Sequence, residues 1–354
     1  MPISMAEEKR KKRWKLIVNI VTLVALVALI YIVRDQIADT ISNFREVNSL
    51  VLFLMIPAQM LNYDAYVRMY RHLFAQLGHK VSYKNMLRIN LELNFVNNVF
   101  PSGGVSGFSY FGVRMKKEGV SSGQSTLVQL MRFVLIFVSF QVLLAVGLFV
   151  LAIEGQASNM VILIAGSLST LLFVGTVLMT YIIGSKKRIN GFFNALTRFL
   201  NRTIHLVRKK NPETINVARV EGMFTELHES YLILKKDPKV LKWPLFHALV
   251  ANFAEILTIY IVYIAFNQWV NPGAVIIAYA IANFAGLISI APGGVGVYEG
   301  IMTAVLASAS VAAGVSIPVT IMYRILNMAI QLPPGYYFYH KTVHDDGISA
   351  RQVT

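Results

Sequence analysis

Two long apolar stretches of this chain are each interrupted by a proline followed by paired glycines. The interruptions read Phe100-PSGGVSG-Phe108 and Ala291-PGGVGV-Tyr298. A bilayer interior offers no water to free backbone groups, so a broken helix persists there only where it lines a cavity or is buried against protein. Paired interruptions at corresponding positions of two halves point to a site near the membrane midplane, as in transporters.

The composition is typical of a polytopic membrane protein. Hydrophobic residues make up 55% of the 354 positions and charged residues only 14%,. The first 15 residues are polar and basic, and no small-residue cleavage site follows the first apolar run, so we expect no cleavable signal peptide. Cysteine is absent, which excludes disulfides and thiolate metal sites,.

Six apolar runs are long enough to cross a bilayer, which takes about 20 residues. They cover residues 14–33, 49–70, 125–153, 160–183, 241–266 and 317–339. The two interrupted stretches, 87–113 and 274–312, each consist of two halves that are too short to cross alone. We therefore predict an all-α integral membrane protein with six spanning helices and two re-entrant helical hairpins. The alternative is that one or both interrupted stretches are kinked spanning helices.

The placement of positive charge predicts the orientation. If the basic N-terminal segment 1–15 is cytoplasmic, most of the 33 Lys and Arg residues fall on the cytoplasmic side or its boundary,. We therefore expect both the N-terminus and the tail 341–354 in the cytoplasm of a bacterium or archaeon, with the protein in the plasma membrane. A full crossing by 87–113 would place Arg114, Lys116 and Lys117 outside, which favours re-entry.

The same orientation makes the two hairpins enter from opposite faces of the membrane. The first hairpin follows an out-to-in helix, and the second follows an in-to-out helix. The two halves are thus predicted to form an inverted repeat of helix, hairpin and helix within one polytopic membrane domain, residues 1–354.

The segment 185–240 is the one sizeable soluble element. Its first part alternates apolar and basic residues at helical spacing, which predicts either an amphipathic helix on anionic inner-leaflet headgroups or a solvated helical hairpin. A second helix is expected from Pro212 to about Lys236. The net charge of +15 lies at membrane edges without a nucleic-acid motif, so we expect no nucleic-acid partner,.

Both interruptions are candidate anion sites. Glycine lets the backbone approach a ligand closely, and the start of a half-helix presents unpaired N–H groups to phosphate or carboxylate. Tight helix packing through small residues is the competing explanation. The candidates are Pro101, Gly103, Gly104, Pro292, Gly293, Gly294 and Gly296, with Asn94 and Asn98 on the first leading half-helix.

Ionisable residues within spans are costly and mark functional sites. Arg132 has no acid beside it in the sequence, so we expect it either to pair with Glu92 or to receive a lipid phosphate. Arg324 has Glu255 on the preceding span as its natural partner. Glu299 falls in the first turn after the second interruption, where it either complements the helix dipole or takes part in proton coupling.

These motifs together resemble the lysylphosphatidylglycerol synthetase/flippase transmembrane-domain family. The resemblance covers roughly residues 14–340, and its most specific piece is the Pro-Gly-Gly-x-Gly-x-x-Glu run that ends at Glu299. Residues that match the family's pattern are Gly103, Gly104, Arg132, Gly293, Gly294, Gly296, Glu299 and Arg324. The chain departs from it at Met131, where the family often has an acid, and at Tyr298, where it often has Arg.

The resemblance implies movement of aminoacylated phospholipids between leaflets. No soluble aminoacyl-transfer domain follows the membrane segments, so we do not expect the chain to make such a lipid itself. We expect a flippase for phosphate-bearing phospholipids. A secondary transporter of a small anion or proton-coupled solute, and a non-catalytic membrane subunit for lipid-linked transfer chemistry, are the alternatives.

No catalytic residues are predicted, because the HExxH, Walker and GxSxG motifs are all absent from the sequence,. No metal or other cofactor is expected either. Phospholipids are the expected partners, and the sequence leaves a homodimer open.

Overall fold

A computed structural model of the chain describes residues 20–21, 24–25, 27–43, 47–100, 105–155, 158–191, 217–288 and 294–346. Helices joined by short turns account for these residues, and no strand occurs among them. The helices are α2 (Arg34–Asn43), α3 (Ser49–Leu52), α4 (Met55–Gln76), α5 (Tyr83–Val99), α6 (Val105–Lys117), α7 (Ser122–Ile153), α8 (Asn159–Ile183), α10 (Val217–Lys236), α11 (Lys242–Ala265), α12 (Pro272–Ile288), α13 (Val297–Ser308) and α14 (Ala313–Asp346), with a 3-10 turn at Pro238–Leu241.

Five of the described segments are long and apolar enough to cross a membrane. They are Ser49–Gln76, Ser122–Ile153, Asn159–Ile183, Pro238–Ala265 and Ala313–His344. These segments coincide with five of the six predicted spans, and the protein is an all-α, multi-pass membrane protein. Of the remaining predicted span, 14–33, residues 20–21, 24–25 and 27–33 are described and are almost all helical, whereas the basic segment 1–15 lies outside the described residues.

Serine caps set the starts of several helices. Ser121 Oγ accepts a hydrogen bond from Gln124 N at 3.2 Å, and Gln124 Oε1 accepts one from Ser121 N at 3.3 Å, which forms a capping box at the start of α7. Ser82 and Ser158 cap α5 and α8 through their own side chains. Each cap satisfies backbone N–H groups that have no partner inside the helix.

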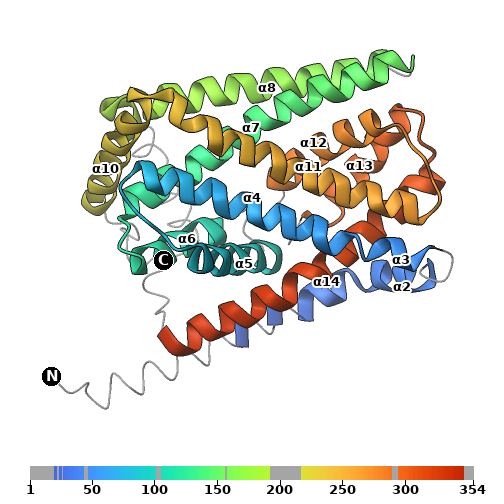
Figure 1. Cartoon of the computed structure of the whole chain (residues 1–354), viewed down its shortest axis with the longest axis horizontal. Coiled ribbons are helices and arrows are strands. Elements are labelled where there is room, and N and C mark those ends of the chain that lie inside the picture. The colour runs from blue at the N-terminus through green and yellow to red at the C-terminus, as the bar shows by residue number, and fades with distance from the viewer. Residues whose placement is uncertain are drawn as a thin grey trace, which may run out of the picture.

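The two interrupted stretches form two pairs of short helices. α5 packs against α6, and α12 packs against α13. Figure 1 shows α5 and α6 toward the end of the bundle that carries α10, whereas α12 and α13 lie toward the opposite end. This is the arrangement expected of two hairpins that enter from opposite sides, although re-entry itself stays a prediction. The first pair covers 83–117, beyond the predicted bounds 87–113, because Ser82 caps α5 one turn earlier than hydropathy indicates.

Helix contacts in the first half recur in the second. α7 packs against α12 as α14 packs against α5, and α6 packs against α7 as α13 packs against α14, while α4 and α11 pack against each other. If α4, α5, α6 and α7 are exchanged with α11, α12, α13 and α14, respectively, this set of contacts is unchanged, as in a two-fold repeat. Glycine allows the close approaches: a Cβ on Gly335 would lie 2.7 Å from Leu91 O, and one on Gly273 would lie 2.5 Å from Gly147 O,.

The soluble segment 185–240 is described only in part. Residues 192–216, which include most of the predicted amphipathic helix, lie outside the described residues. The second helix, α10, ends at Lys236 as predicted and packs against α7, where Gly123 N donates to Glu226 Oε2 at 3.3 Å. The predicted tail 341–354 begins as helix, because α14 continues to Asp346.

Candidate functional site

Arg132 lies in α7 against aromatic rings. Its Cζ is 5.1 Å from the ring centroid of Tyr66 and 6.0 Å from that of Tyr70, both on α4, and 5.8 Å from that of Phe133. Such contacts attract a guanidinium but leave its charge unneutralised. Its Nε is buried without a hydrogen-bond partner, and within the described residues no Asp or Glu oxygen lies within 4.0 Å of Arg132.

The expected partner of Arg132, Glu92, is engaged elsewhere. Glu92 Oε2 lies 2.6 Å from Arg114 Nε and accepts a hydrogen bond from the Tyr110 hydroxyl at 2.9 Å. Its other oxygen accepts one from the Thr342 hydroxyl at 2.7 Å. Of the two alternatives for Arg132, the pair with Glu92 was wrong, because the packing of α6 against α5 brings Arg114 against Glu92. This network joins the first helix pair to α14.

Arg324 contacts the described part of the second interruption. Its Nη1 lies 2.9 Å from Glu299 Oε1, with both side chains largely buried, and it also donates to Gly294 O at 3.4 Å. Glu299 Oε2 in turn accepts a hydrogen bond from Gly296 N at 2.7 Å, which caps α13. Gly294 and Gly296 have φ of +70° and +85°, a conformation that favours glycine,.

The predicted Glu255–Arg324 pair was therefore wrong, and Glu255 has neutral partners instead. The Tyr323 hydroxyl donates to Glu255 Oε1, and Asn327 Nδ2 donates to the same oxygen at 2.8 Å. On the other oxygen, Gln59 Nε2 donates at 3.1 Å. Glu255 thus sits where α4, α11 and α14 meet, and Gln331 extends the network by donating to Asn327 Oδ1 at 2.9 Å.

The remaining predicted site residues divide into two groups. Pro101, Gly103, Gly104, Pro292 and Gly293 lie outside the described residues. Asn94 and Asn98 interact within α5, where Asn98 Nδ2 donates to Asn94 O at 2.8 Å. On another face of α5, the Asn97 side chain lies directly against Gly107 of α6, and its Cγ would be 2.7 Å from a Cβ at that position.

A comparison with known protein families places these contacts in context. The model of the lysylphosphatidylglycerol synthase TM region matches residues 16–335. The chain belongs to this family. Membership in this family implies a membrane protein that takes part in lipid modification or lipid flipping. A search of the curated proteins found no match.

The structure shows the contacts of the Pro-Gly-Gly-x-Gly-x-x-Glu run that ends at Glu299. Its described members, Gly294, Gly296 and Glu299, all contact Arg324 or one another. In the first half, the corresponding half-helix α6 contains no acidic residue. The two intramembrane arginines therefore differ, because within the described residues Arg324 is paired with a carboxylate and Arg132 is not.

Sequence reasoning missed the residues of α4 that line this region. Gln59 contacts Glu255, and Tyr66 and Tyr70 face Arg132. Their spacing of seven and four residues places them near one face of a helix, and a polar and aromatic stripe within an apolar span was the signal available.

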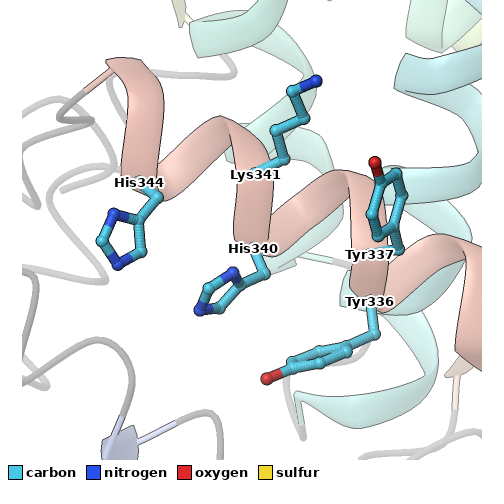
Figure 2. A pocket seen from close by; sticks show the side chains of 5 residues that line it. All are labelled: Tyr336, Tyr337, His340, Lys341 and His344. Atoms are coloured by element: carbon cyan, nitrogen blue, oxygen red, sulfur yellow. The ribbon is translucent and has the colours of Figure 1, made fainter.

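The described residues also form an open depression of about 360 Å³ at the C-terminal end of α14. It is lined by Tyr336, Tyr337, His340, Lys341 and His344. Figure 2 shows Tyr336, His340 and His344 in a row along one side of the helix. None of the predicted site residues lines it, and tyrosine with lysine is typical of a membrane–water boundary.

Proposed function

We propose that this protein moves phosphate-bearing phospholipids between the leaflets of a membrane and that Arg132 receives the lipid phosphate. The proposal rests on the surroundings of the Arg132 guanidinium. It lies among aromatic rings, and no carboxylate of the described residues pairs with it. Membership in a family of lipid modification or flipping supports a lipid as the source of the phosphate.

The energetic reason is the cost of an unpaired charge in a membrane. An Arg at the centre of a spanning helix costs about 2.5–3.5 kcal/mol on insertion scales. Arg324 avoids much of this cost through Glu299, at 2.9 Å. Among the described residues Arg132 has no such partner, so a phosphate that reaches it supplies the missing negative charge. The acyl chains remain in the bilayer while the headgroup passes.

The two interruptions complete the proposed path. We propose that glycines of the two interruptions, among them Gly103, Gly104 and Gly293 outside the described residues, offer backbone N–H groups to the phosphate. Gly296 is excepted, because its N–H already donates to Glu299. Re-entrant hairpins from opposite sides would place both interruptions near the midplane. The proposal also takes the membrane to be the plasma membrane, with both termini in the cytoplasm. Aminoacylated phospholipids carry the same phosphate and belong to the same substrate class.

Transbilayer movement in liposomes tests the proposal. Purified protein is reconstituted with headgroup-labelled phosphatidylglycerol, its lysyl form or a zwitterionic lipid, and the label that reaches the outer leaflet is quenched. We expect protein-dependent movement of the phosphatidylglycerols that falls at least tenfold in Arg132→Ala. Arg68→Ala removes an exposed arginine paired with Asp64 and should keep the wild-type rate.

Two results would overturn the proposal. Full movement in Arg132→Ala would remove Arg132 from the path. No movement of any lipid by folded protein, together with uptake of soluble glycerol phosphate by the same vesicles, would show that the anion is a small solute. Arg132→Lys keeps the charge without the planar fork, and we expect it to retain part of the rate.

A further inference from the structure

We propose that Glu255 carries a proton during translocation, so that one proton and one phosphate anion cross the membrane together. The inference rests on the proposed function and adds its driving force. Glu255 lies near the middle of α11, whose 24 residues extend about 36 Å,. Its side chain is buried, and an ionised carboxylate at this depth is costly unless a positive charge compensates it,.

The described groups around Glu255 carry no compensating charge. The contacts from Gln59, Tyr323 and Asn327 are all made by neutral donors, and no Lys, Arg or His nitrogen of the described residues lies within 4.0 Å. The titratable groups that interact with it electrostatically are Tyr63 on α4, Tyr279 on α12, Tyr298 on α13 and Tyr323 on α14. Tyrosine is neutral at physiological pH. The nearest charged side chains on α13 and α14, Glu299 and Arg324, pair with each other.

The hydrogen-bond shell accommodates both protonation states. The Tyr323 hydroxyl rotates, so it donates to a carboxylate and accepts from a carboxylic acid in the same position. The Gln59 amide likewise presents either its nitrogen or its oxygen to Glu255 by turning over. A proton can therefore bind without any rearrangement of the three helices.

A polar stripe connects the carboxyl group with less buried positions. Tyr323, Asn327 and Gln331 follow one another at four-residue spacing on α14, which places them on one helix face,. Asn327 contacts Glu255, and Gln331 contacts Asn327. Both amide side chains are only partly buried, so the stripe gives water a polar route toward the carboxyl group.

Charge balance makes the proton and the anion favour each other. The buried pairs Glu92–Arg114 and Glu299–Arg324 each sum to zero. With Glu255 ionised, the charges of Glu255 and Arg132 also sum to zero, so the buried groups of the described residues offer an incoming phosphate no net attraction. With Glu255 protonated, the same sum is +1, which one phosphate anion neutralises. Binding of either species therefore promotes binding of the other, and the two cross as a neutral pair.

A pH gradient across proteoliposomes tests this coupling. The vesicles hold headgroup-labelled phosphatidylglycerol and a one-unit pH gradient, with the membrane potential held at zero by potassium and valinomycin. We expect the label to accumulate in the leaflet that faces the alkaline side, by up to tenfold, because one proton per lipid at one pH unit corresponds to a factor of ten. An imposed potassium diffusion potential should change nothing, since the pair is neutral.

Matched carboxylate variants complete the experiment. Glu255→Gln should abolish the response to the pH gradient, whatever rate of movement it retains. Glu154→Gln removes an exposed carboxylate at the end of α7 and keeps an oxygen for Asn271, so it should respond as the wild type does. Size-exclusion chromatography verifies that both variants are folded.

Each contrary result has a distinct meaning. Phosphatidylglycerol that moves equally with and without the gradient would overturn proton coupling and leave the proposed function intact. A gradient response retained in Glu255→Gln, or a response to potential alone, would also overturn it. Absence of movement under every condition would overturn the proposed function and the coupling together.

Discussion

Removing the positive partner of the buried Glu92–Arg114 pair should destabilise the protein by an amount that depends on pH. The two side chains are 1% and 10% exposed, and their charged atoms lie 2.6 Å apart. In Arg114→Met the carboxylate keeps the hydrogen bonds from Tyr110 and Thr342 but loses its counter-ion. A carboxylate buried in this way takes up a proton instead of remaining charged.

The cost of that proton sets the size of the effect. A glutamate with the ordinary pKa of about 4.3 binds a proton at pH 7 at a cost of about 3.7 kcal/mol, because each pH unit corresponds to about 1.4 kcal/mol. We therefore expect Arg114→Met to lower the free energy of unfolding by about 4 kcal/mol at pH 7, in the range known for broken buried pairs. The folded variant binds a proton that its unfolded chain releases, so the loss shrinks to about 1 kcal/mol at pH 5.

Denaturation in detergent micelles, followed by tryptophan fluorescence at both pH values, measures the loss against wild type. The double variant Glu92→Gln/Arg114→Met removes both charges and should lose less than about 1.5 kcal/mol, with no difference between pH 7 and pH 5. An equal loss for Arg114→Met at the two pH values would refute the reasoning. A loss below about 1 kcal/mol at pH 7 would show that the site is well hydrated.

Three further changes test single features of the fold. Gly335→Ala should lower the melting temperature, because the added Cβ would lie 2.7 Å from a carbonyl oxygen of α5. At Gly112 the added Cβ has open space, so Gly112→Ala should be neutral or stabilising,. Equal melting temperatures for the two variants would contradict this reasoning. Ser121→Ala removes the cap of α7 and should lower the free energy of unfolding by about 1 kcal/mol in the same denaturation assay,. Unchanged stability of this variant would contradict the role of the cap. Glu299→Gln leaves Arg324 without its carboxylate and should cost about 3–5 kcal/mol, and unchanged stability would show that the pair contributes nothing,.

Much of the helical layout could be predicted, and the errors have definite causes. Hydropathy located five spans that coincide with long apolar helices of the structure, and the interruptions located the ends of the short helices. The predicted helix boundaries were wrong where a polar capping residue starts the helix before the apolar run, as Ser82 does for α5. The same limit applies to the end of α14, which continues through polar residues to Asp346.

The charged pairs could not be predicted, and both expected partnerships were wrong. Arg324 pairs with Glu299 and not with Glu255, although either acid suits it by charge. The outcome depends on the rotation of α13 and α14 about their axes, which no local pattern reveals. The aromatic surroundings of Arg132 were likewise hidden, because Tyr66 and Tyr70 lie on a helix more than sixty residues away in the sequence.

The amino-acid sequence alone specifies a multi-pass helical membrane protein, the positions of its interruptions and the family to which it belongs. These properties depend on hydropathy, caps and glycines, which act over a few neighbouring residues. Tertiary structure alone decides which buried charges cancel and which remain. Ion pairs depend on the distance between side chains of helices that are remote along the chain, and helix packing fixes that distance. In this protein that packing pairs Arg324 and Arg114 with carboxylates, while it surrounds Arg132 with aromatic rings and Glu255 with neutral donors.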